Sequence, residues 1–202
     1  MRIAFFGGSF DPPHRGHLAV ARAAADAFHL DSILFAPAGR QPLKLDRASS
    51  SFADRLAMTT LACAEDAERF QASAIDAPRS DGLPNYTVDT LAELRRTMPD
   101  AALFNLVGAD SFLDLPRWRE PNRLLELAEW IVVSRPGVSL PGVSPLHLTA
   151  HQQARVHLLN TVSEEVSATT LRQRLHTGDP CTDLLPAAVS TYIREHHLYQ
   201  PG

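Results

Sequence analysis

Two histidines stand three residues apart near the start of the chain, in the stretch His14-Arg15-Gly16-His17. They follow Gly7-Gly8, which ends a short apolar run, and they come where a helical pattern begins. Glycines let backbone N–H groups approach a ligand closely, and the first turn of a helix offers free N–H groups at the positive end of its dipole. Residues three apart share one side of a helix, so each imidazole can donate a ring N–H to the same phosphate. The spacing predicts a phosphate site whose fixed donors stabilise a transition state.

The same pair of histidines is also compatible with two different roles. They could be a chance pair on the surface, or two ligands of a zinc site, which would need a third ligand that the sequence does not obviously supply. The simple G-x-G-x-x-G pattern of dinucleotide-binding folds is absent from this stretch.

Apolar runs alternate with helical patterns along almost the whole chain. The runs predict strands at 3–6, 32–36, 70–75, 103–107, 130–133 and 156–159. The 3.6-residue periodicity predicts helices at 17–28, 51–68, from residue 87 onward, and at 121–128, 169–176 and 186–196. The residues of 51–68 expected to face inward are Phe52, Leu56, Thr59 or Thr60, and Cys63.

The strands are continuously apolar, as strands covered on both faces must be, and Asn105 is the polar exception in the run 103–107. The expected fold class is therefore α/β, a single-domain, Rossmann-like, doubly wound parallel sheet with C-terminal helices, spanning residues 1–202. The stretch 135–147, rich in proline and glycine, predicts a loop within this alternation and not a domain boundary.

Composition limits the class of protein. The formal net charge of −4 argues against a general nucleic-acid binder, which needs a basic face, but it leaves room for a local basic nucleotide pocket. The two cysteines, Cys63 and Cys181, match no metal-binding spacing and suggest a reducing compartment without a disulfide framework. No stretch is typical of a signal peptide or a membrane span, so a cytoplasmic protein is expected.

The opening stretch GGSFDPPHRGHL resembles the signature of the nucleotidyltransferase superfamily that carries a (T/H)xGH motif. The superfamily's second signature, roughly ISSTxIR, is similar to VSATTLR at 166–172, where Ala168 replaces the second serine and one hydroxyl contact is missing. Ser167 or Thr169 can cap the helix that carries Arg172, which makes a second helix start beside a guanidinium. Taken alone, this segment could equally be a capped surface helix. The resemblance implies a single nucleotidyltransferase domain over the whole chain.

Motifs in the middle of the chain resemble those of the nicotinate-nucleotide adenylyltransferase family, and the likeness extends over nearly the whole chain. The segment 37–44 (PAGRQPLK) is similar to the family's PxxxxPHK, with Leu43 where histidine is usual, and 79–94 (RSDGLPNYTVDTLAEL) to R-x-G-x-SYTxDTLxxL, with two extra residues and Asn85 for serine. The other similar segments are LVGADSFLDLPRW at 106–118, VVSRPG at 132–137 and LLPAAVSTYIREHHLY at 184–199.

This resemblance implies a set of site residues. The implied catalytic residues are His14, His17, Lys44 and Arg172. The implied ATP-binding residues are Gly7, Gly8, Ser9, Phe10, His14, His17, Gly108, Asp110, Ser167, Thr169 and Arg172. The residues implied to bind nicotinate mononucleotide are Ser9, Phe10, Lys44, Tyr86, Thr87, Trp118 and Arg135.

Several of these residues could equally have plain structural roles. Asp110 can accept hydrogen bonds from ribose hydroxyls, but it can also be the N-cap of the next helix. Trp118 can stack on a pyridinium ring or simply pack in the core. Lys44 can reach a triphosphate or be a solvated surface charge, and Arg135 can bind phosphate or hold its loop.

The implied reaction transfers an adenylyl group from ATP to nicotinate mononucleotide and releases pyrophosphate, with Mg²⁺ held by the phosphates and water and no metal site of protein ligands. Expected partners are these two nucleotides, with no nucleic acid and no membrane, and a homo-oligomer stays open. The alternatives are an adenylyltransferase for nicotinamide mononucleotide or phosphopantetheine, a nucleotide-binding regulator without activity, and, more weakly, a dinucleotide hydrolase.

Overall fold

The computed structural model describes residues 1–40, 50–134, 148–160 and 167–200. Six strands form one parallel sheet: β1 (Arg2–Gly8), β2 (Ser32–Pro37), β3 (Phe70–Ala72), β4 (Ala102–Gly108), β5 (Glu129–Ser134) and β6 (Val156–Asn160). Their order across the sheet is β3-β2-β1-β4-β5-β6. The predicted doubly wound parallel sheet is confirmed.

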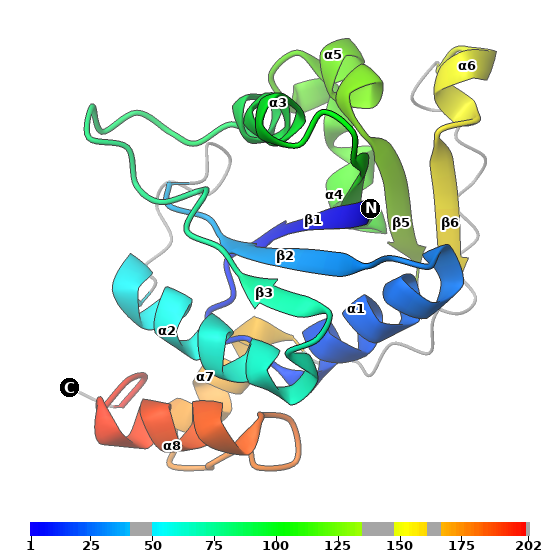
Figure 1. Cartoon of the computed structure of the whole chain (residues 1–202). Helices are drawn as coiled ribbons and strands as arrows, with labels where there is room; N and C mark the ends of the chain where they lie inside the picture. Colours follow the sequence, from blue (N-terminus) through cyan, green and yellow to red (C-terminus); the bar gives the residue numbers. More distant parts are fainter. Residues whose placement is uncertain (41–49, 135–147, 161–166, 201–202) are drawn as a thin grey trace.

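Helices cover both faces of this sheet (Figure 1). On one face lie α1 (Arg15–Phe28), α2 (Phe52–Cys63), α7 (Ala168–His176) and α8 (Ala187–Glu195). The other face is covered by α3 (Thr87–Thr97), α4 (Ala109–Leu113) and α5 (Pro121–Leu127). Two buried clusters fill the two layers, one including Leu18, Met58 and Leu185, the other including Leu91, Leu124 and Trp130.

The strand order reverses direction between β1 and β4. The connections from β1 onward run to one side of the sheet, and those from β4 run to the other. At such a switch point the two chain crossovers diverge and leave a crevice at the carboxyl ends of the strands. Gly7-Gly8 ends β1 and Gly108 ends β4, so the glycines singled out in the sequence meet at this crevice.

The inward face of α2 differs from the prediction. Thr59 and Cys63 are buried as predicted, but Phe52 and Leu56 are only half-buried. Arg55 and Met58, which were not predicted to face inward, are buried. The helix is rotated so that the Arg55 guanidinium reaches the connection after β1, where it finds carbonyl acceptors. A buried arginine requires such partners, and the apolar pattern alone does not reveal them.

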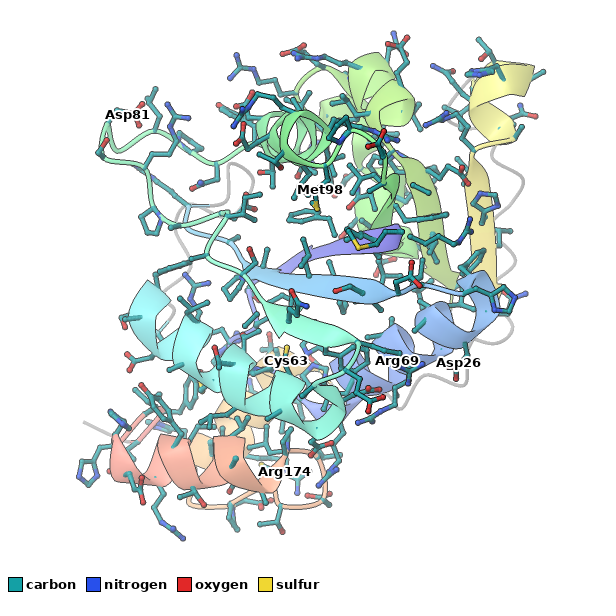
Figure 2. All side chains as sticks on the ribbon, in the orientation of Figure 1. Asp26, Cys63, Arg69, Asp81, Met98 and Arg174 are labelled. Carbon is teal, nitrogen blue, oxygen red and sulfur yellow. The ribbon has the colours of Figure 1, made fainter. Side chains whose placement is uncertain are left out.

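Shorter elements were not predicted. These are α4, α6 (Ala150–Gln153), and the 3₁₀ turns Ala64–Asp66 and Leu115–Arg117. The predicted strand 70–75 ends at Ala72, and the predicted helix 51–68 ends at Cys63. The Cys63 sulfur lies between α2 and β3 in Figure 2, and both cysteines are free and buried.

Candidate active site

The crevice at the ends of β1 and β4 contains a cavity of about 400 Å³ on the α3 face of the sheet. Its lining includes seven of the predicted site residues: Gly7, Gly8, Ser9, Tyr86, Thr87, Gly108 and Trp118. His14 and His17 belong to the start of α1 on the opposite face. The end of β1 therefore separates a cavity on one side from the histidine pair on the other.

The two imidazoles form one unit at the start of α1. His14 is the N-cap residue, and its backbone N–H donates to Nδ1 of His17 at 3.2 Å. The two rings stack with centroids 3.6 Å apart. Because Nδ1 of His17 accepts a hydrogen bond, the proton of a neutral His17 ring resides on Nε2.

Burial keeps both rings uncharged. It lowers the pKa of His14 to about 4, and burial together with neighbouring His14 holds the pKa of His17 well below its usual value. At neutral pH each ring is thus a neutral imidazole with a single N–H donor. His14 is 6% exposed, and its Nδ1 has no hydrogen-bond partner among the described residues.

An aromatic cluster supports His17. Phe10 packs edge-on against His17 and Phe6, with ring centroids 5.0 and 5.4 Å away, and also contacts Phe35. Phe10 is 1% exposed and adopts the left-handed backbone conformation, with φ 45°. Its side chain is committed to the core, so a nucleotide contact at Phe10 would use the backbone.

The glycines at the end of β1 have a packing reason in addition to any ligand. A Cβ on Gly7 would lie 2.9 Å from the Phe5 ring, and one on Gly8 would lie 3.2 Å from the Phe10 ring. Both distances are shorter than ordinary carbon contacts. Larger residues here would displace the rings that line the crevice and support His17.

The connection from β1 to α1 is held by groups from distant parts of the chain. Arg55 donates to the Ser9 carbonyl at 3.0 Å, and Arg172 donates to the Asp11 carbonyl at 2.7 Å. The Asp11 carboxylate is 2% exposed and accepts from the Tyr199 hydroxyl at 2.6 Å and from the Ser50 N–H. Burial and Asp11 raise the pKa of Tyr199, so this hydroxyl stays protonated and donates.

Sequence reasoning missed Arg55, Asp11 and Tyr199 as parts of the site. Arg55 carried a usable signal, since it stands one turn before Thr59 on the predicted inward face. For Asp11 and Tyr199, 188 residues apart, no local pattern indicated contact.

The second predicted phosphate segment lies beside this connection. Ser167 is the N-cap residue of α7, but its side chain makes no capping hydrogen bond. Thr169 Oγ1 instead accepts from Arg172 at 3.3 Å. Arg172 thus links α7 to the histidine segment through the Asp11 carbonyl, a contact that the sequence did not predict.

Several residues predicted to bind nicotinate mononucleotide line the cavity on the α3 face of the sheet. Tyr86 is the N-cap residue of α3 and Thr87 its first residue, and both line the cavity, so the start of this helix lies beside it. The Arg119 guanidinium lies 4.8 Å from the centre of the Tyr86 ring. Trp118 is half-buried, with its ring centroid 6.0 Å from that of Trp130.

The remaining predicted residues lie at the edges of this arrangement. Gly108, not Asp110, is the N-cap residue of α4, and Asp110 is exposed in the first turn. Lys44 and Arg135 lie outside the described residues.

The chain is similar to proteins of a known family. The Cytidylyltransferase-like family model matches residues 5–174. Two relatives named "Probable nicotinate-nucleotide adenylyltransferase", from Roseiflexus sp. (strain RS-1) and Neisseria meningitidis serogroup B, are each 42% identical, with 98% of this chain and 98% of the relative covered. The chain belongs to the nicotinate-nucleotide adenylyltransferase family.

A solved structure supports the fold independently. Plasmodium falciparum nicotinic acid mononucleotide adenylyltransferase, complexed with NaAD, is similar with a TM-score of 0.78 and 19% identity, covering 98% of this chain and 97% of that one. No helix in the described part of the chain has the length and apolar character needed to cross a membrane.

Removal of the Tyr199 hydroxyl tests the network around the histidines. We expect Tyr199→Phe to lower the free energy of unfolding by about 1–2 kcal/mol, because it removes a hydrogen bond to a buried carboxylate. We expect turnover to fall roughly tenfold, because small displacements at a reacting centre slow the chemical step strongly. Urea unfolding and steady-state turnover measure the two effects.

Tyr192→Phe is the matched control, since the Tyr192 hydroxyl donates to Asp54 at 3.0 Å and does not touch the histidine segment. This variant should keep normal turnover. An equal loss of turnover in both variants would contradict a specific role for Tyr199.

The lowered pKa of His14 predicts a pH effect on stability. Below the ordinary pKa of 6.5 the unfolded chain binds a proton at this residue, whereas the folded protein does not until about pH 4. The free energy of unfolding therefore falls by up to about 1.4 kcal/mol per pH unit as pH decreases through this window. Urea unfolding at pH 7, 6 and 5 should show a shallower fall for His14→Asn than for the unmodified protein; parallel curves would show that His14 is not buried in its neutral form.

Proposed function

We propose that the protein transfers the adenylyl group of ATP to nicotinate mononucleotide, giving nicotinate adenine dinucleotide and pyrophosphate. The observation that carries this proposal is the pair of neutral imidazoles at the start of α1, at the β1–β4 switch point. Beside them lies a cavity large enough for the pyridine ring of a mononucleotide. The relatives' names and the NaAD bound to the Plasmodium protein support the choice of substrates.

The nucleophile is a phosphate oxygen of nicotinate mononucleotide. A phosphate monoester has a second pKa near 6 and is mostly dianionic at neutral pH, so it needs no general base. What the reaction needs is in-line alignment with the α-phosphate of ATP and compensation of charge on the transferring group. No covalent intermediate with the protein is required.

His17 and His14 supply neutral N–H donors to the α-phosphate. The backbone N–H of His14 keeps the His17 proton on Nε2, so this donor is oriented before substrate binds. A donor fixed in this way stabilises the transition state without the cost of reorientation. Protonation is not needed for this role, which agrees with the lowered pKa of both rings.

Arg172 and Lys44 bind the β- and γ-phosphates in this proposal. Arg172 donates to the Asp11 carbonyl and to Thr169, so part of its donor capacity positions the histidine segment. Its remaining guanidinium N–H groups can meet phosphate oxygens.

The acceptor occupies the cavity on the α3 face. The start of α3 at Tyr86 and Thr87 attracts the nicotinate carboxylate, and Trp118 offers a ring face to the pyridinium. Arg117 and Arg119 also line the cavity, and each pairs with a neighbouring carboxylate, Arg117 with Asp114 at 3.4 Å and Arg119 with Glu120 at 3.6 Å.

We propose that ATP binds as its Mg²⁺ complex, with the ion held mainly by phosphate oxygens and water. In the described part of the chain no three His, Cys, Asp or Glu side chains gather in a way that could hold a metal ion. Oxygen-rich octahedral coordination suits phosphates and water, and the ion supplies charge neutralisation to the leaving pyrophosphate. We also propose a cytoplasmic location, which the two free cysteines favour.

Pyrophosphate release with ATP and Mg²⁺ tests the proposal when three acceptors are compared: nicotinate mononucleotide, nicotinamide mononucleotide and phosphopantetheine. We expect the highest kcat/KM with nicotinate mononucleotide. Highest activity with phosphopantetheine would contradict the acceptor assignment, and ATP binding without release for any acceptor would indicate a nucleotide-binding regulator.

In the same assay His17→Ala should lower kcat by about 10²–10³-fold, because one transition-state donor is lost. His151→Ala is the control, since His151 is exposed on α6. Near-normal turnover of a folded His17→Ala variant would contradict the role of His17.

A further inference from the structure

Asn105 is a buried polar residue in the middle of β4 whose side chain is left without partners. It is 1% exposed, and neither its Nδ2 nor its Oδ1 has a hydrogen-bond partner among the residues that the structure describes. Its neighbours along the strand, from Leu103 to Val107, are all apolar. An amide buried without partners costs stability, because its donors and acceptor lose their bonds to water.

The position of Asn105 connects it with the acceptor cavity. In the sheet register it lies between Phe5 of β1 and Trp130 of β5, and it shares the strand face of Val107. Asn105 and Val107 both line the cavity, together with Tyr86 and Trp118. The lining of the cavity thus combines half-buried aromatic side chains with a buried amide that lacks partners among the described residues.

The amide offers a ligand both a donor and an acceptor. A ring carboxylate is only an acceptor, so it can use the Nδ2–H groups but is repelled by Oδ1. A carboxamide can use both, since its carbonyl accepts from Nδ2 while its NH₂ donates to Oδ1. Asn105 therefore complements a carboxamide better than a carboxylate.

We propose that Asn105 is a specificity-determining residue that lets this protein also use a pyridine mononucleotide carrying a carboxamide. This inference rests on the proposed adenylyl transfer. The start of α3 favours the carboxylate form, and Asn105 lowers the discrimination against the neutral amide form. The acid remains the better acceptor, and the amide is a second substrate of the same site.

Ser32 is a second residue of the sheet with an unpaired buried polar atom in the described part of the chain, and it differs from Asn105 in its location. Ser32 also has a buried hydroxyl without a partner in the described residues, but it begins β2, at the opposite end of the strands from the cavity. Ser32 thus shares the burial of an unpaired polar atom without access to the acceptor. It provides the matched control.

The test measures kcat/KM for pyrophosphate release with nicotinate mononucleotide and with nicotinamide mononucleotide, in the unmodified protein, Asn105→Leu, Asn105→Ala and Ser32→Ala. We expect the unmodified protein to use both acceptors. In both Asn105 variants the value for the amide should fall about tenfold or more, mainly through KM, while that for the acid falls less than about threefold. Asn105→Leu should also raise the Tm, because it removes an unpaired amide while keeping a similar side-chain volume. Asn105→Ala keeps the test valid if leucine does not pack.

Ser32→Ala should leave the ratio of the two kcat/KM values unchanged. The inference is overturned if the unmodified protein uses the acid but not the amide, or if the ratio is the same in the Asn105 variants. An unmodified protein inactive with both acceptors would overturn the proposed function and this inference with it.

Discussion

The connection between β1 and α1 is the element on which the rest of the site depends. Four groups hold it: Arg55 from α2, Arg172 from α7, the Ser50 N–H and the Tyr199 hydroxyl near the end of the chain. These bonds satisfy the carbonyls and the carboxylate of a segment that would otherwise be buried with unpaired polar atoms. They also fix the backbone of this segment, whose His14 N–H orients the His17 ring. The same hydrogen bonds therefore stabilise the segment and set the geometry of the imidazoles.

Unpaired buried atoms gather where the proposed substrates bind. Among the described residues, the buried side-chain atoms without partners are His14 Nδ1, the two amide atoms of Asn105, and Ser32 Oγ, so three of the four flank the β1–β4 crevice. Natural structures pair nearly all such atoms, and exceptions often mark sites where a ligand completes the bonding. The histidines on one face of the sheet and the amide on the other therefore describe two halves of a site that meets at the end of β1.

The sequence was most informative where the determining contacts are local. The alternation of apolar runs and helices predicted the parallel sheet, and the turn from Gly8 to His17 predicted a phosphate site, because strand, glycines and helix start are consecutive. Short α4 and α6 were missed, since helices of five and four residues contain too few turns for a periodicity to stand out. Arg172 required a resemblance to a family, and Asp11 and Tyr199 required the folded structure, because their partners are far away along the chain. Asn105 stood out as the polar residue of an apolar strand, but only the packing shows that its amide lacks partners.

In the proposed reaction, two neutral, pre-oriented imidazoles receive the α-phosphate. The most direct test is ¹⁵N NMR of the histidine rings at pH 7, before and after addition of Mg²⁺ with a non-hydrolysable ATP analogue. We expect a neutral His17 ring protonated at Nε2 in the free protein, and changed ring ¹⁵N shifts for both His14 and His17 when the analogue binds. A doubly protonated His17, or ring shifts that stay the same although the analogue is bound, would contradict it.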